Sequence, residues 1–370
     1  MPKLKRAALF CCILFVAAAV LWPGLWNQPL QHQQISQWIR GKKLAYQGTL
    51  QVWYIPGHAS GTGDGSKWAK ARLDKFEKNN FGIFYEMQIL DTQGMQAKLS
   101  AGQRPDLVFF GSEQADVVVP LLQQCEQTAK LAPAWQDKTV EQLAWPVFYS
   151  GYAILVNEQA LYSVGLSPPL DIEDMDQAYL QQVQQALPNA FAYETKQAGL
   201  AAMGAQMNEQ TRQAIVQGGS GTRAQFLKEE IAFFACPAST WYTIEGLSNT
   251  QSVPSYQAVP LSNLAVEAQY VGVMKTEDQA KTKACNAAVA YLLSQNSQQA
   301  LEDIGALPVI WTDEPMQAQG SITGALWQHR EEKNMCVLDK AESIETFFAT
   351  LQASGFDDAA QWLRTACNTP

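Results

Sequence analysis

The chain has 370 residues, 47% of them hydrophobic and 16% charged, and its formal net charge is −9. This composition is typical of a globular protein of one to three domains and excludes an intrinsically disordered chain. The acidic balance argues against nucleic acid as a partner, because affinity for nucleic acid comes mainly from Lys and Arg side chains that neutralise phosphates.

The N-terminal residues 1–27 indicate export from the cell. Three basic residues precede the uncharged run Ala7–Trp22, and a basic start before such a run is typical of a cleaved signal peptide. A retained membrane anchor fits as well, because residues 23–26 prolong the run toward the roughly 20 residues that span a bilayer. In both cases the body lies at the extracellular face of the membrane or is secreted, and we expect residues 28–45 to form a polar stalk.

The body begins with alternating strand and helix patterns. Apolar, β-prone runs predict strands over Tyr46–Ile55, Gly82–Leu90 and Pro105–Phe110. Helical spacing predicts two helices between them, of which the second covers Thr92–Ala101. The first should bury one face, made of Trp68, Ala69, Leu73 and Phe76. This order of elements predicts right-handed crossovers and a parallel sheet.

The middle of the chain contains a proline-bearing strand pattern at Trp145–Leu155 and a helical pattern at Asp176–Leu187. Arg223–Phe234 predicts a helix that runs into a strand, and Cys236–Trp241 then predicts a loop. Three further stretches have helical character: Gln197–Met207, Ala341–Ala353 and Asp357–Cys367.

The most distinctive stretch ends in the letters IGALPV and begins with a buried strand predicted over Gln269–Met274. Thr276 followed by Gln279 is a capping-box signature for the start of a long helix. Asn296 fits as the cap of a second, short helix, and Gly305 stands where a left-handed C-terminal cap is wanted.

These segments resemble the extracellular solute-binding proteins of ABC importers, in particular the maltose-binding-like group. The shared letters are the helix AVAYLLS with its exit IGALPV, the strand PDL, and the motif GYA with a following VN. The resemblance covers roughly Tyr46 to Val309. One departure is plain: where the family usually has Gly between a helix and the next strand, this chain has Glu229 or Glu230.

The resemblance implies an α/β, two-lobed periplasmic-binding-protein-like fold of type II, with a ligand cleft between lobes joined by crossing strands. Lobe 1 would comprise residues 46–146 plus 260–308, and lobe 2 residues 147–259 plus 309–370. Gln257–Pro260 would begin the return to lobe 1.

The resemblance also implies the extracellular substrate-binding subunit of an ABC transporter. Such a protein binds a small solute, here a sugar or oligosaccharide above all, and delivers it to permease subunits, as a monomer without a cofactor. Two alternatives stay open: a membrane-tethered sensing protein of the same fold that presents its ligand to a receptor, and a binding protein for a non-sugar solute. A lipoprotein is not expected, because Cys11 and Cys12 stand too early, behind a poor lipid-attachment motif.

The residues expected to bind the solute follow strand ends and loops that the family aims at the cleft. Aromatic faces stack on sugar rings, and glycines let the backbone approach a ligand closely. Since neighbouring strand residues point to opposite faces, we expect Tyr54 in the cleft and Trp53 in the core. Core packing is the alternative for each aromatic residue, and a surface turn is the alternative for the glycine-rich loop. The full set is Tyr54, Gly57, His58, Asp64, Phe110, Gly111, Ser112, Tyr149, Tyr152, Trp241 and Tyr242.

An enzyme is not expected. Of the three histidines only His58 lies near the expected site, and Ser220 lacks the G-x-S-x-G context of a nucleophile. No spacing typical of a metal site is present. Cys336 and Cys367 could form a disulfide outside the cell, and buried free thiols are the alternative for every cysteine of the body, namely Cys125, Cys236, Cys285, Cys336 and Cys367.

Overall fold

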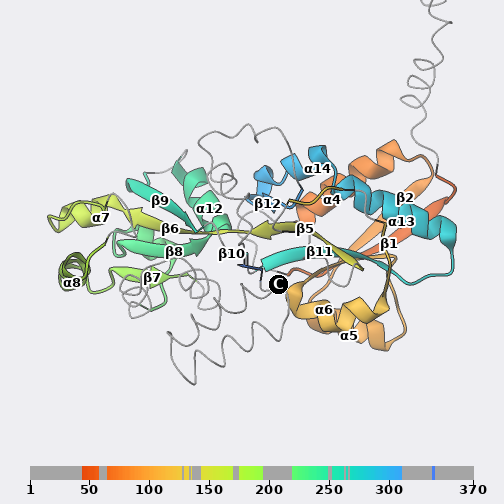
Figure 1. The fold of residues 1–370 in the computed structure, drawn as a ribbon, viewed down its shortest axis with the longest axis horizontal. Coiled ribbons are helices and arrows are strands. Elements are labelled where there is room, and N and C mark those ends of the chain that lie inside the picture. Colours follow the sequence, from red (N-terminus) through yellow and green to blue (C-terminus); the bar gives the residue numbers. More distant parts are fainter. Residues whose placement is uncertain are drawn as a thin grey trace, which may run out of the picture.

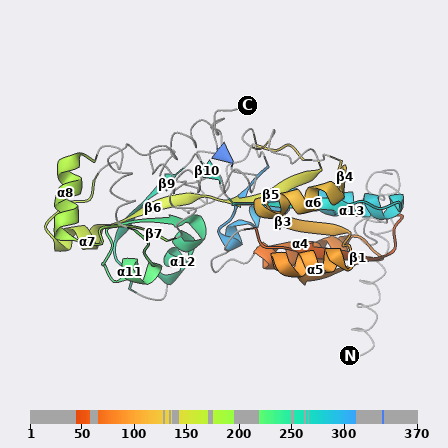
Figure 2. The same cartoon turned by 90° about the horizontal axis from the view of Figure 1, so that it is seen from below.

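The computed structural model contains two main β-sheets with helices on their faces, joined by strands that lead from one sheet to the other (Figure 1, Figure 2). The larger sheet lies at one end of an elongated molecule and the smaller sheet at the other (Figure 1). The residues that the structure describes are 44–57, 65–126, 129–132, 135, 143–169, 175–194, 219–248, 252–261, 264–265, 267–310 and 336–337.

The first strands of the larger sheet are parallel, as the order of elements predicts. β1 (Gly48–Tyr54) pairs with β2 (Ile83–Ile89) on one side and with β3 (Leu107–Gly111) on the other. Helices α4 (Gly65–Asn79) and α5 (Thr92–Ser100) connect these strands and cover opposite faces (Figure 1). The predicted strands and helices of this region are confirmed, with end points that differ by a few residues.

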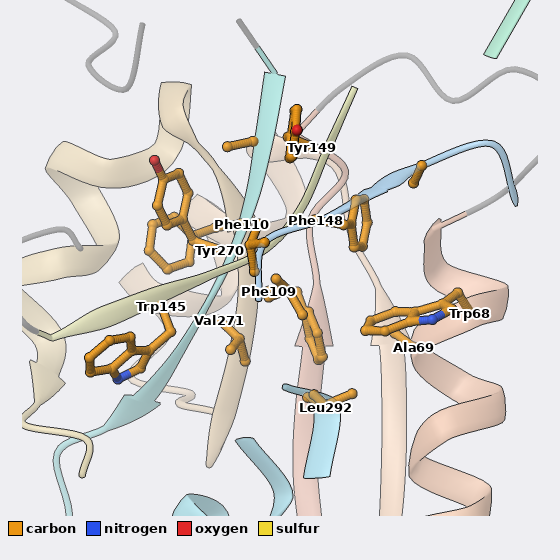
Figure 3. Packing of buried hydrophobic residues seen from close by; sticks show 14 of the residues in the cluster. Trp68, Ala69, Phe109, Phe110, Trp145, Phe148, Tyr149, Tyr270, Val271 and Leu292 are labelled. Carbon is orange, nitrogen blue, oxygen red and sulfur yellow. The ribbon is translucent and has the colours of Figure 1, made fainter. Parts of the chain in front are cut away.

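Helix α4 buries the face that its spacing predicts, made of Trp68, Ala69, Leu73 and Phe76. The indole Nε1 of Trp68 donates a hydrogen bond of 3.0 Å to the carbonyl of Ser297. Its ring meets Phe148 edge-on at a centroid distance of 5.4 Å (Figure 3). A large aromatic side chain buried with its polar atom satisfied stabilises the sheet–helix interface.

Strands from the middle and the end of the described chain complete the larger sheet in antiparallel fashion. β11 (Glu267–Met274) lies between β3 and β5 (Ala144–Ser150). β12 (Leu307–Pro308) pairs with β5, and β4 (Leu122–Gln123) pairs with the end of β11. Helix α13 (Gln279–Leu292) follows β11 and packs beside α4 (Figure 1). This confirms the buried strand and the long helix predicted for this stretch.

The smaller sheet has the strand order β7–β8–β6–β9, in which β7 and β8 are parallel and β6 is antiparallel to both of its neighbours. The strands are β7 (Phe191–Tyr193), β8 (Phe233–Pro237), β6 (Tyr152–Asn157) and β9 (Tyr256–Leu261). The helices of this lobe are α7 (Glu158–Ser163), α8 (Gln177–Ala186), α11 (Arg223–Leu227) and α12 (Ala238–Ser248). Both the helix predicted at Asp176–Leu187 and the helix-to-strand pattern at Arg223–Phe234 are confirmed.

The chain first passes from the larger to the smaller sheet at Gly151, between β5 and β6. Strand β5 belongs to the larger sheet as far as Ser150, where it still pairs with β11. This passage therefore lies a few residues beyond the lobe boundary expected at 146/147.

The return to the larger sheet comes after β9. Gln257–Pro260, expected to lie in the return, instead belongs to β9, which pairs with β6 along its whole length. That prediction is wrong, because the pattern of an apolar strand does not tell to which sheet the strand is added. The short strand β10 (Leu264–Ala265) follows, paired with β13 (Cys336–Val337), and β11 begins at Glu267.

The long helix α13 begins later than its sequence signature predicts. Asp278 caps it, with Oδ1 accepting from the backbone N–H groups of Ala280 and Lys281 at 2.9 and 3.0 Å. Thr276 lies two residues before this cap, and its hydroxyl instead accepts from the N–H of Asp278 at 3.3 Å. A carboxylate that satisfies two unpaired donors outcompetes the capping box between Thr276 and Gln279.

The next helix, α14 (Gln295–Gln299), begins after Ser294 and not after Asn296. The left-handed cap predicted further on is confirmed, since Gly305 has a φ of 64° after a short 3₁₀ turn.

Of Glu229 and Glu230, the two residues named for the helix-to-strand step, Glu229 has a left-handed backbone. Its φ of 63° is the one positive value among the non-glycine residues described, and this left-handed conformation is where L-residues are strained. The segment Cys236–Trp241, predicted as a loop, is the end of β8 followed directly by the first turn of α12.

Three cysteines, Cys125, Cys236 and Cys285, are buried and free, which confirms the free-thiol alternative for them. Burial raises the pKa of the Cys125 thiol to about 12. The disulfide considered between Cys336 and Cys367 involves a residue outside the described chain, as do the export segment, most of the stalk and the helices expected at Gln197–Met207, Ala341–Ala353 and Asp357–Cys367. Within the described ranges, none of the helices has the length and apolar character needed to cross a membrane.

Candidate functional site

The ends of the parallel strands of the larger sheet form a continuous edge, which we call the lobe 1 rim. Ile55–Gly57 follows β1, Asp91–Thr92 follows β2, and Gly111–Gln114 contains the end of β3 and the turn after it. Parallel strands end at the same edge of a sheet, and open α/β sheets bind ligands there. The lobe 1 rim is therefore the candidate site of this lobe.

An open cavity of about 580 Å³ lies along the rim, lined by Ile55, Pro56, Ile89, Leu90, Asp91 and Thr92. Small-molecule sites usually have volumes of roughly 300–1,000 Å³. The lining is mostly apolar and gains a carboxylate and a hydroxyl from the start of α5. Asp91 is held in place because its Oδ1 accepts from the N–H of Gly94 at 2.6 Å. Such a lining suits a ring with apolar faces and a polar edge.

Two glycines of the rim, Gly57 and Gly111, are in direct backbone contact. A Cβ atom added to Gly57 would lie 2.3 Å from the Cα of Gly111, and one added to Gly111 would lie 2.2 Å from the Cα of Gly57. Because real Cβ atoms do not approach backbone so closely, only glycine fits both positions. The structure thus brings together two residues that the sequence predicted for the site, and it explains their identity by packing.

Gln114 joins the ends of two strands. It is 3% exposed, and its Oε1 accepts from the N–H of Gly111 at 2.9 Å while its Nε2 donates to the hydroxyl of Thr92 at 3.2 Å. Gln269 serves the third strand end: its Oε1 accepts from the N–H of Gly57 and its Nε2 donates to the carbonyl of Ile55, both at 3.0 Å.

The sequence prediction missed both glutamines. Gln269 stands in a strand whose other residues read as apolar, and a polar side chain in such a strand must find partners inside the protein. That was the available signal for Gln269. For Gln114 no comparable signal exists, because it follows the strand and reads as an ordinary turn residue.

The predicted aromatic residues of lobe 1 are packed in the core. Tyr54 is 2% exposed and its ring lies 5.5 Å from that of Phe109, while Phe110 is 0% exposed and stacks on Tyr270 at 5.9 Å. In Figure 3, Phe110 and Tyr270 lie on one side of the sheet, and Phe109 lies on the other side with Trp68.

Tyr149 is likewise buried, with its ring 4.9 Å from that of Trp135. Trp53 is also buried, as expected. Since helices cover both faces of this sheet, alternation along β1 sends both Trp53 and Tyr54 into packed layers. Ligand contact by these rings stays a prediction.

The smaller sheet has an equivalent edge, the lobe 2 rim. Glu194 follows β7, and Ala238–Thr240 follow β8, the strand parallel to it. The hydroxyl of Thr240 donates a hydrogen bond to the carboxylate of Glu194. Below it, Cys236 has a thiol pKa raised by burial and, to a smaller extent, by the negative charge of Glu194. Carboxylate and hydroxyl groups of this kind are suited to bind sugar hydroxyls.

Two of the predicted aromatic residues of lobe 2, Trp241 and Tyr242, lie in the first half of α12. Trp241 is 6% exposed, whereas Tyr242 is only partly buried. The hydroxyl of Tyr242 donates to the carbonyl of Asp303 at 3.2 Å, and its side chain packs against Gly305. Tyr242 therefore connects α12 of the smaller sheet to the segment that leads into β12 of the larger sheet.

Four predicted site residues are described only in part or not at all. His58 and Asp64 lie outside the described residues. For Ser112 and Tyr152 the structure gives the backbone alone, at the end of β3 and at the start of β6 respectively. Over the ranges that are described, no group of His, Cys, Asp and Glu side chains gathers in a way that could hold a metal ion.

Comparison with known proteins identifies the fold. No family model matches the sequence, and no curated protein sequence matches it. The structure is similar to an ABC substrate-binding protein from Listeria monocytogenes in complex with cycloalternan, with a TM-score of 0.59 and 10% identity over 87% of this chain and 98% of that one.

It is also similar to the cyclic alpha-maltosyl-1,6-maltose binding protein from Arthrobacter globiformis, with a TM-score of 0.58, 12% identity and coverage of 87% and 98%. A third similar structure is the GacH receptor of Streptomyces glaucescens, solved unliganded and with acarbose, with a TM-score of 0.57, 14% identity and coverage of 87% and 97%. Because nearly the whole of each protein is matched, the chain has the two-lobed α/β fold of the maltose-binding type of ABC substrate-binding proteins.

Proposed function

We propose that the chain is the extracellular substrate-binding subunit of an ABC transporter and that it binds an oligosaccharide between its lobes. The observation that carries the proposal is the pair of rims, each at the carboxyl edge of parallel strands, in two lobes joined by strands. The ligands named for the three similar proteins are cycloalternan, cyclic maltosyl-maltose and acarbose. They support carbohydrate as the class of ligand.

The open cavity of lobe 1 suggests how binding is coupled to a change of shape. A ligand held by one rim alone stays exposed to water, whereas a ligand held by both rims gains contacts only when the lobes approach each other. Such differential binding shifts the population toward the closed form, which a membrane permease then recognises. We propose that the protein acts in this way as a monomer outside the cell, without a cofactor and without chemical change of the solute.

Isothermal titration calorimetry of the full chain tests the proposal. The panel holds maltotriose, cyclic α-glucans, xylo-oligosaccharides and chito-oligosaccharides, with amino acids, short peptides and polyamines as the non-sugar arm. We expect saturable binding of at least one oligosaccharide. A response to the non-sugar arm alone would overturn the carbohydrate assignment, and silence toward every solute would overturn the transport function.

A matched pair of variants tests the site itself. Gly111→Ala disturbs the rim contact with Gly57 and should weaken oligosaccharide binding at least tenfold. Gly246→Ala lies in α12, where an added Cβ meets no atom within 4 Å, and should bind as the unmodified protein does. Equal binding by both variants would remove the lobe 1 rim from the site.

A further inference from the structure

Gln269 is a buried polar residue whose side chain contacts a distant part of the chain. It is 0% exposed. Its two side-chain hydrogen bonds, both 3.0 Å long, go to Gly57 and Ile55, which lie 212 and 214 residues away in sequence. Its Nε2 donates to the carbonyl of Ile55 and its Oε1 accepts from the N–H of Gly57. The side-chain amide therefore holds one backbone acceptor and one backbone donor of the rim segment Ile55–Gly57. A side chain that only filled space would not need both partners.

The position of Gln269 in its strand is also special. β11 begins at Glu267, directly after the chain has returned from the smaller sheet. Opposite Gln269 stands Phe148 of β5, but the next residue, Tyr270, stands opposite Pro146. Val147 is therefore an extra residue on β5, which makes a β-bulge beside Gln269. Bulges bend a strand and disturb its ladder locally.

We propose that Gln269 is a positioning residue. Its side chain ties the Ile55–Gly57 segment of the lobe 1 rim to the crossing strand β11, so that this segment moves together with β11. The proposal rests on the proposed function and adds to it the residue through which the crossing sets the geometry of the ligand-binding edge. β5 and β11 are the strands that lead to and from the smaller sheet, and residues at the ends of elements absorb the change when lobes rotate.

Apart from Gln269, few described contacts hold the rim segment Ile55–Gly57 in place. The N–H of Ile55 donates to the carbonyl of Phe109 at 2.9 Å, which aligns the start of the segment with β3. Gly57 touches Gly111 without a hydrogen bond between them in the described contacts. The N–H of Gly57 is therefore held by Gln269, and loss of that side chain should release it.

A second buried glutamine supplies a matched control. Gln298 is 1% exposed, and it also bridges backbone groups: its Nε2 donates to the carbonyls of Val147 and Leu292 at 2.8 and 3.1 Å, and its Oε1 accepts from the N–H of Val309 at 3.0 Å. It thus supports the same bulge from another side, and none of these hydrogen bonds goes to the rim segment Ile55–Gly57. The two glutamines differ in which backbone they hold.

Amide hydrogen exchange of the full-length protein, with residue resolution, tests the proposal through Gln269→Met and Gln298→Met. Methionine keeps the length of the side chain and removes every hydrogen bond. In Gln269→Met we expect the Gly57 amide to exchange at least tenfold faster, with the Val309 amide unchanged. In Gln298→Met the pattern should be reversed. An unchanged Gly57 rate in Gln269→Met overturns the proposal, and so does an equal acceleration of Gly57 in both variants.

If Gln269→Met does not fold, Gln269→Leu gives the same reading, because leucine likewise offers neither the acceptor for the Gly57 N–H nor the donor to the Ile55 carbonyl. A binding arm uses the oligosaccharide that the unmodified protein binds most tightly, with an expected loss of at least tenfold in Gln269→Met and less than threefold in Gln298→Met. Should no sugar bind the unmodified protein, the proposed function fails while the exchange rates still decide the role of Gln269.

Discussion

Replacing Gly57 by alanine introduces one methyl group at the contact between two backbones. The new Cβ would lie 2.3 Å from the Cα of Gly111, 2.9 Å from its N and 3.2 Å from Oε1 of Gln269. Two carbon atoms rest at about 3.5–4.0 Å, so the backbones must separate by roughly 1.2 Å or more. Neither side can yield by a simple rotamer change, because the nearest atoms belong to the main chain.

The magnitude follows from two effects. Forced overpacking costs about 1–3 kcal/mol, and a lost or lengthened hydrogen bond between the Gly57 N–H and Gln269 adds about 1 kcal/mol. We expect Gly57→Ala to lower the free energy of unfolding by about 2–4 kcal/mol. In urea the midpoint should fall with an unchanged slope, since the surface exposed on unfolding is the same.

Two further variants sharpen this measurement. Gly246→Ala, a helix position where the added methyl meets no neighbour within 4 Å, should raise the stability by about 0.5–1 kcal/mol. The double variant of Gly57 and Gly111 should lose less than the sum of the two single losses, because one separation of the backbones relieves both overlaps. A Gly57→Ala protein as stable as the unmodified one, or strictly additive losses, would refute the packing argument.

Three other predictions concern the backbone, the thiols and the N-terminus. Glu229→Gly should raise the free energy of unfolding by about 0.5–1 kcal/mol in urea titrations, because it removes a left-handed L-residue whose strain is about 1–2 kcal/mol. Glu230→Gly should give no gain in stability. A gain in Glu230→Gly and none in Glu229→Gly would contradict the placement of the strain at Glu229. Burial raises the pKa of the Cys125 thiol in the folded state to about 12, whereas the unfolded thiol ionises near its ordinary pKa of 9.0. Rising pH above about 9 therefore favours unfolding, by up to about 1.4 kcal/mol per pH unit for each such thiol, and Cys125→Ala should make this decline shallower; an identical decline in the variant would be the contrary result. Mass spectrometry of the exported protein should find a chain that starts after Trp26 if the signal is cleaved, whereas an intact N-terminus would establish the anchor.

The fold was predictable where a single physical pattern dominated. The apolar run ending in Phe110 could only be a buried strand, and the spacing of Trp68, Leu73 and Phe76 assigned the buried face of α4. The start of helix α13 was harder to predict, because two neighbouring residues could each cap it. Thr276 and Asp278 both suit the start of a helix, and only the structure shows that the carboxylate satisfies two donors at once.

The meeting of Gly57 and Gly111 at the lobe 1 rim was predictable, because loops after parallel strands share one edge. Their contact with a ligand stays a prediction, as does that of the aromatic side chains. Tyr54 was expected in the cleft by alternation, but alternation cannot tell that both faces of the sheet are covered. Gln114 and Gln269 escaped notice because their partners are backbone groups that lie near them only in the folded chain.

The central place of β11 has a consequence for how the chain folds. β11 lies between β3 and β5, yet everything that builds the smaller sheet is synthesised before it. The sheet of lobe 1 is therefore incomplete until the chain has been made as far as β12, which ends at Pro308. The N–H of Gly57 gains its hydrogen bond only from Gln269, 212 residues later in the sequence. Contacts of such long range slow folding, because loop closure must precede any gain from pairing.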